Sequence, residues 1–189
     1  MYFNSSLPQI GTLQNVDVVN GQPTTEISAW WQWWVRDQDN FPVSLPLSVS
    51  EDDSILCSLV VVTPTKVKFL IKNQTTGYMI APFDQVAPMA QMTHMPSPIQ
   101  VEISGATAEW IMERPTKLQS TQLYELPNYN RVEFKNCLAV SASSEMADRT
   151  HDLSNANLIN MMAVREHPHR TVPISVAQRQ GNNGIITTP

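Results

Sequence analysis

Charged residues are scarce in this sequence: they make up only 15% of its 189 residues, whereas soluble domains usually carry about a quarter. Surface helices normally carry many lysines and glutamates, so the shortage argues against a helical protein. Threonine, serine, asparagine, glutamine and valine are plentiful instead, and they suit β-strands. The formal net charge of −5 leaves no basic stripe to bind phosphates, so we expect no nucleic-acid partner.

Long apolar runs and cysteine clusters are also absent. No run reaches the roughly 18 apolar residues of a membrane-spanning helix, so we expect no membrane partner. Residues 1–6 lack the basic and apolar regions of a signal peptide. The two cysteines, Cys57 and Cys137, are too few for a disulfide framework, and a single bond between them stays open. Cys57 lies in the apolar run 55–62, so we expect a small buried side chain there.

Short apolar or alternating segments, separated by turn signals, predict a β-sandwich or barrel. The expected strands are residues 11–19, 26–36, 45–49, 55–62, 66–72, 78–81, 99–103, 107–114 and 131–141. Asn20-Gly21 is a strong hairpin signal, because both residues accept positive φ angles. Residues 82–98 are expected to form a long loop, and residues 153–164 fit a helical turn and a strand equally well. The length suits one sizeable core, so a single domain over residues 1–189 is predicted.

Four tryptophans lie close together in the second expected strand. If that strand is regular, one side carries Trp30, Gln32 and Trp34, and the other carries Trp31 and Trp33. A strand buried on both sides explains this pattern, and composition favours that explanation. Alternatively, Trp30 and Trp34 form the floor of a groove in which an extended peptide or a sugar stacks.

The expected strand 107–114 carries two glutamates, Glu109 and Glu113, which share a face by the same alternation. Such carboxylates can perturb each other's pKa, which is one route to a general acid or base. Two solvated carboxylates at a sheet edge give the same pattern, and on composition alone they are the more frequent case.

The sequence offers no convincing metal or cofactor motif. His167 and His169 could present two imidazoles on one strand face, but no third ligand follows at a metal-binding spacing. The acidic turn Glu51-Asp52-Asp53 lacks the alternating oxygen ligands and the glycine of a calcium loop. Nucleophile elbows, phosphate-binding loops and dinucleotide fingerprints are absent as well. We therefore predict no metal and no cofactor.

Five tracts carry a resemblance through their order and spacing. They are Ala29-Trp30-Trp31-Gln32-Trp33-Trp34, Ser50-Glu51-Asp52-Asp53-Ser54-Ile55, Asn73-Gln74-Thr75-Thr76-Gly77, Ala108-Glu109-Trp110-Ile111-Met112-Glu113 and Val132-Glu133-Phe134-Lys135-Asn136. Together they resemble the glutamic peptidases, the eqolisin family of acid proteases. The resemblance extends from about residue 10 to residue 165.

The resemblance implies a sandwich of two antiparallel sheets, of the concanavalin A-like or jelly-roll type, with a concave substrate groove. It also implies catalysis by one glutamate and one glutamine, which here correspond to Glu113 and to Gln14 of the tract Thr12-Leu13-Gln14. Ionised Glu113 would take a proton from the attacking water and return it to the leaving amine. The Gln14 amide would hydrogen-bond the developing oxyanion, with both side chains in one groove beside Trp30 and Trp34.

The sequence also departs from the family pattern. The family's first strands would lie before Gln14, but only thirteen residues precede Gln14 here. Asn4 would take the place of an aspartate at the end of the second sequence tract of those strands. Gln32 replaces a glutamate of the tryptophan-rich strand. The residues expected to contact substrate are Trp30, Gln32, Trp34, Asn4 and Glu109. Missing strands would expose sheet edges and invite pairing with another chain. We therefore expect a homo-oligomer through those edges, a truncated gene product, or a fold in which the divergent C-terminal segment, residues 165–189, fills the gap.

We therefore predict an acid-active endopeptidase that cleaves protein or peptide substrates and is secreted, as the resemblance implies. The alternative is a non-catalytic β-sandwich module that holds a peptide or a glycan against the face of Trp30. A structural assembly protein is a third hypothesis.

Overall fold

The computed structural model describes residues 6–36, 38, 41–91, 96–115, 122–143, 146–166 and 169–189. The chain divides into two compact units, Met1–Ser104 and Gly105–Pro189, and each is described by itself. Across the described ranges the regular elements are antiparallel β-strands and one turn of 3₁₀ helix, Leu153–Asn155, so the prediction of an all-β protein is confirmed. The described part of the chain contains no helix with the length and apolarity needed to cross a membrane.

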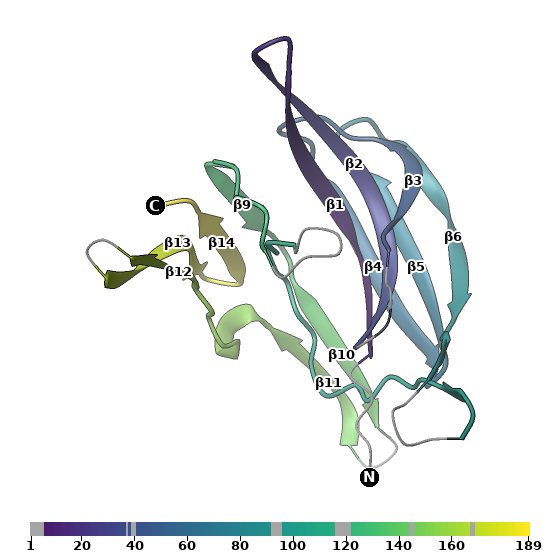
Figure 1. Ribbon diagram of the computed structural model, residues 1–189. Helices are drawn as coiled ribbons and strands as arrows, with labels where there is room; N and C mark the ends of the chain where they lie inside the picture. Colours follow the sequence, from purple (N-terminus) through teal and green to yellow (C-terminus); the bar gives the residue numbers. More distant parts are fainter. Residues whose placement is uncertain are drawn as a thin grey trace. The chain divides into compact units, whose positions relative to one another are not determined.

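The first unit begins with a long β-hairpin. β1 (Ser6–Val19) pairs with β2 (Gln22–Val35), and β2 pairs with β3 (Val43–Ser48), which gives a sheet in the order β1-β2-β3 (Figure 1). In the connecting turn, Asn20 and Gly21 have φ angles of 53° and 75°, as the sequence predicted. The turn sets the register of the hairpin, which runs without a bulge along the whole length of β1.

A second sheet contains β4 (Ile55–Thr63), β5 (Lys66–Asn73) and β6 (Met79–Val86), in that order (Figure 1). The prediction that residues 82–98 form a loop is wrong at its start, because β6 continues through Pro82 to Val86. Proline is tolerated there because β6 is an edge strand, where a missing N–H can face away from the ladder. The short strands β7 (Met89–Ala90) and β8 (Ile99–Gln100) form a separate pair, so the strand expected at 99–103 is shorter than predicted.

The two larger sheets of the first unit pack together through alternate residues. Trp33 and Val35 of β2 share one buried cluster with Val67 and Phe69 of β5. The ring of Phe69 lies 5.6 Å from that of Trp31 and 5.5 Å from that of Phe83, measured between centroids. Burying a ring of this size stabilises the fold by about 2–3 kcal/mol relative to leaving it exposed. This unit therefore has a sandwich core of its own, with Phe69 near its centre.

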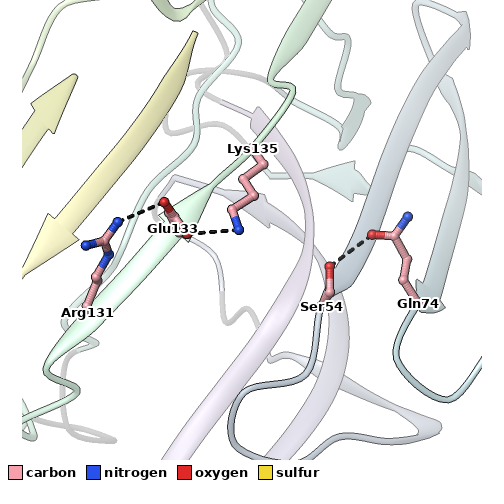
Figure 2. Close-up of polar contacts among 5 residues, drawn as sticks. All are labelled: Ser54, Gln74, Arg131, Glu133 and Lys135. Atoms are coloured by element: carbon pink, nitrogen blue, oxygen red, sulfur yellow. Dashed lines mark hydrogen bonds and ion pairs between the residues drawn. The ribbon is translucent and has the colours of Figure 1, made fainter. Parts of the chain in front are cut away.

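Two hydrogen-bonded turns lie at one end of this sandwich. The fully buried Asn73 side chain donates to the Ser48 carbonyl at 3.1 Å and to Asp53 Oδ2 at 2.7 Å. The Ser54 hydroxyl donates to Gln74 Oε1 at 3.0 Å (Figure 2). These bonds hold the acidic turn at residues 51–53 against the turn that follows β5.

The second unit contains a four-stranded sheet and a two-stranded one. The larger has the order β12 (Met161–Glu166), β13 (His169–Gln180), β14 (Asn183–Thr187) and β9 (Arg131–Phe134), and the smaller pairs β10 (Leu138–Ser143) with β11 (Met146–Asp152). The strand expected at 131–141 is therefore two strands, separated where Asn136 adopts a φ of 53°. Residues 153–164 contain both predicted alternatives, the 3₁₀ turn and much of β12.

The cysteines differ in environment, and both are free thiols. Cys137 is buried, whereas Cys57 is exposed, so the prediction of a buried Cys57 is wrong. The reason is that β4 lies at the edge of its sheet, where the apolar run 55–62 is left largely uncovered.

Candidate active site

The tryptophan-rich strand β2 presents two different faces. Trp31 and Trp33 lie on the core side, where Trp33 is buried and Trp31 contacts Phe69. By strand alternation, Trp30, Gln32 and Trp34 lie on the opposite side of the sheet. The two-sided pattern that the sequence predicted is therefore present, and the face of Trp30, Gln32 and Trp34 is called the outer tryptophan face below.

Gln14 does not belong to the outer tryptophan face. Residues directly opposite each other on antiparallel strands place their side chains on the same side of the sheet. Gln14 lies opposite Ile27, which shares the alternation of Ala29 and Trp31, so Gln14 is on the core side of the sheet. Its side chain is exposed near the tip of the hairpin. The expectation that Gln14 shares one groove with Trp30 and Trp34 is wrong for this reason.

A second glutamine, Gln9, lies on the outer tryptophan face. The register places Gln9 directly opposite Gln32, with Gly11 opposite Trp30 and Leu7 opposite Trp34. Both glutamines are half-buried. The sequence prediction missed Gln9 because it followed the Leu-Gln tract, whereas counting back through the Asn20-Gly21 turn would have found it.

The outer tryptophan face also carries an unused donor. Within the described residues, the indole Nε1 of Trp30 is buried and has no hydrogen-bond acceptor. A buried N–H without an acceptor costs about 1–3 kcal/mol, so this unpaired donor lowers the stability of the first unit. By contrast, the indole Nε1 of Trp33 on the core side donates to the Ser6 hydroxyl at 3.0 Å.

The two glutamates of the tract 108–113 belong to the second unit. The prediction of a strand at 107–114 is wrong, since no ladder forms anywhere between residues 101 and 115. Exposure still alternates there, with Trp110 and Met112 more buried than Glu109, Ile111 and Glu113. The segment is anchored at its end, where the Tyr124 amide donates to the Pro115 carbonyl at 3.0 Å.

Glu113 has the electrostatics of a proton-transfer group. Partial desolvation, followed by repulsion from the Glu109 carboxylate, raises the pKa of Glu113 above its ordinary value. The Thr107 hydroxyl donates to Glu109 Oε1 at 3.1 Å and holds that carboxylate in place. The charge of Glu109 therefore contributes to the raised pKa of Glu113.

The glutamate of the next tract behaves in the opposite way. Glu133 binds Arg131 at 2.8 Å and Lys135 at 3.0 Å (Figure 2). Hydrogen bonds from Lys135 and then Arg131 lower the pKa of Glu133. A carboxylate held in the charged form by two cations is a poor proton donor, so Glu133 is not a candidate general acid.

A hollow of about 310 Å³ lies at one edge of the first sandwich. Its lining includes Trp31, Gln32, Phe41, Val43 and Met89, and none of the described lining residues is acidic, histidine or cysteine. These described residues suit an apolar group.

Three of the residues considered in the sequence cannot be placed. Asn4, His94 and His167 lie outside the described residues. Among the residues that the structure describes, no three histidine, cysteine or acidic side chains gather closely enough to hold a metal. Each unit therefore carries its own set of candidate residues: the Gln9–Gln32 pair with Trp30 and Trp34 in the first, and Glu113 with Glu109 in the second.

One of the comparisons with known proteins shows a family, and another shows a fold. The model of the Peptidase A4 family matches residues 2–183. The structure is similar to the crystal structure of aspergilloglutamic peptidase from Aspergillus niger, with a TM-score of 0.67 and 18% identity over 95% of this chain and 89% of that chain. At that identity the likeness shows a shared β-sandwich fold. No curated protein sequence gives a significant match.

Proposed function

Because the chain belongs to the Peptidase A4 family, the glutamic peptidases, we propose that it is an acid-active endopeptidase in which Glu113 and Gln9 carry the reaction. The Peptidase A4 family is a family of peptide-bond hydrolases.

Glu113 is the proposed general base and acid. In its ionised form it accepts a proton from a water molecule whose oxygen attacks the scissile carbonyl carbon, forming a tetrahedral intermediate. The protonated Glu113 then donates that proton to the amide nitrogen as the carbon–nitrogen bond breaks. The raised pKa of Glu113 supports this role, because a carboxyl group that can hold a proton in weak acid can also return it.

Gln9 is the proposed oxyanion stabiliser, in place of the Gln14 that the tract match suggested. An amide N–H donor aimed at the developing oxyanion stabilises the intermediate more than the substrate. The observation that carries this choice is the register that puts Gln9 on the outer tryptophan face, opposite Gln32 and near Trp30. On the same face, Trp30 and Trp34 offer indole rings against which a substrate backbone can pack, and the buried Trp30 Nε1 can donate to a substrate carbonyl.

Digestion of an unfolded protein at about pH 3 tests the proposal. Wild-type protein should produce peptides, and Glu113→Gln should abolish cleavage while leaving the circular dichroism spectrum unchanged. Glu133→Gln is the matched control, because it removes an ion-paired carboxylate of the same unit that has no proposed role. Equal cleavage by wild type and Glu113→Gln would refute the peptidase mechanism.

One observation favours a second candidate function, the non-catalytic binding module. The family's glutamate in the tryptophan-rich strand is Gln32 here, so this face has lost an acidic group while keeping its indole rings. In that case Trp30→Ala would abolish retention of an extended peptide or an oligosaccharide, and no preparation would cleave protein at any pH.

A further inference from the structure

Strand β4 is an unusually exposed sheet edge. Within the described residues it pairs with β5 alone, and its other edge has no partner strand. Its side chains are apolar and largely exposed, with exposed fractions of 43% for Leu56, 53% for Val60 and 49% for Val62. An exposed edge of nine apolar or small residues is a template on which another strand can pair.

The other edge strands of the two three-stranded sheets carry blocking residues, and β4 does not. Proteins block open edges with proline or with charged side chains. β1 contains Pro8 and Asp17, β3 contains Pro46, and β6 contains Pro82 and Asp84. β4 contains neither proline nor a charged residue, and its one irregularity lies at the end, between Val61 and Thr63. Of these four edges, β4 is the one left able to accept a strand.

The two ends of β4 carry opposite charge. The acidic turn of Glu51 and Asp52 precedes its first residue, and the bonds from Asn73 and Ser54 fix that turn in place. At the other end, Thr63 lies opposite Lys66. Among the described residues, Lys66 and Lys68 share one acidic partner, Asp84, at 2.7 Å and 3.6 Å, which leaves a net positive charge there.

We propose that β4 pairs antiparallel with β4 of a second copy of this chain, across a two-fold axis. Antiparallel pairing sets the acidic end of each β4 beside the lysine end of its partner, so the charge complementarity is satisfied twice. Such a contact is isologous and closes on itself, and it therefore gives a dimer rather than a fibre. The exposed leucine and valine side chains of the two strands then cover each other as cross-strand neighbours.

The assignment predicts how substitutions act on the oligomeric state. Lysine on β4 would be repelled by its symmetry mate and would block the edge, so Val60→Lys should weaken the dimer at least tenfold. Leu56→Lys, on the same side of the strand, should do likewise. Val86→Lys is the matched control, because Val86 has a similar exposure of 59% but lies on β6, at the opposite edge of the same sheet.

Sedimentation velocity of the full chain at pH 7, from about 1 to 100 µM, measures these effects. The expected result is a monomer–dimer equilibrium that Val60→Lys and Leu56→Lys shift to monomer and that Val86→Lys leaves unchanged. A monomer throughout this range would overturn the proposal, as would equal weakening by Val60→Lys and Val86→Lys, or growth beyond the dimer.

A second measurement tests the charge pattern without altering β4. Glu51→Gln combined with Asp52→Asn should weaken the dimer a few-fold in low salt, and about 1 M NaCl should remove the difference. An unchanged dissociation constant in low salt would contradict the antiparallel arrangement. Since neither measurement uses peptidase activity, failure of the proposed function leaves this inference unaffected.

Discussion

Gln9 and Gln32 lie directly opposite each other on β1 and β2, and their side chains emerge beside Trp30 and Trp34. This pair presents two neutral amides on one face of the sheet. The titratable groups of the candidate site are therefore Glu113 and Glu109, both carried by the second unit. The candidate hydrogen-bonding residues therefore belong to the first unit and the candidate proton-transfer residues to the second.

Replacing each glutamine of β1 by alanine distinguishes their roles. Gln9→Ala should lower kcat roughly 100-fold, as removal of an oxyanion donor usually does. Gln14→Ala should leave kcat within about twofold of wild type, because Gln14 is exposed on the other side of the sheet. Steady-state cleavage of a peptide substrate in acid measures both. The reverse ranking would return the catalytic role to Gln14.

Glu109→Gln should move the pH profile of cleavage in a defined direction. The negative charge of Glu109 helps to raise the pKa of Glu113, after desolvation. Removing that charge lowers the pKa of Glu113, so Glu113 stays ionised to lower pH. The acidic limb of the kcat/KM profile should therefore shift to lower pH. The matched control is Glu102→Gln, an exposed glutamate of the first unit that is not among the causes of the Glu113 shift. An acidic limb that stays in place would show that Glu109 does not tune Glu113.

Much of the fold could be predicted from local signals. The Asn20-Gly21 turn and the alternation of β2 fixed the first hairpin, because both depend on residues close together in the chain. The extension of β6 through Pro82 could not be predicted, since proline forbids a central strand but not an edge strand, and edge position is a property of the whole sheet. The exposure of Cys57 was mispredicted for the same reason.

The candidate site was predicted less evenly. Glu109 and Glu113 followed from alternation, and their interaction is present although the segment forms no ladder. The Leu-Gln tract alone could not show that Gln14 lies on the core side of the sheet, away from Trp30 and Trp34, because that follows from strand register. Shifting a residue by an odd number of positions along β1 moves its side chain to the other face of the sheet. Gln14 and Gln9 are five residues apart, so only one of them can face Gln32.

Phe69 should be critical to the stability of the first sandwich. It is fully buried between Trp31 and Phe83, and Phe69→Ala should lower the free energy of unfolding by about 3–5 kcal/mol, because it removes a ring and leaves a cavity. Phe41→Ala is the control, since Phe41 is 60% exposed and should change stability by less than about 0.5 kcal/mol. Urea denaturation followed by tryptophan fluorescence measures both. Similar losses for the two variants would contradict the assigned core.

Asp53 should link the stability of the first unit to pH. Hydrogen bonds from the Ser50 amide and from Asn73 lower its pKa in the folded protein. A carboxylate with a lowered folded pKa stabilises the protein above the unfolded pKa, which is about 3.9 for aspartate. That contribution is lost as the pH falls through the lower folded value, which is the range in which an acid peptidase works. Asp53→Asn should therefore lower the urea midpoint at pH 7 and have progressively less effect in stronger acid.

The neighbouring Asp52 provides the control for this prediction. Asp52 is exposed, with a φ of 66°, and Asp52→Asn places there a residue that tolerates this conformation. The urea midpoint of Asp52→Asn should stay close to that of the wild-type protein at every pH. An Asp53→Asn penalty that is as large in strong acid as at pH 7 would show that Asp53 stabilises the turn through its shape and not through its charge.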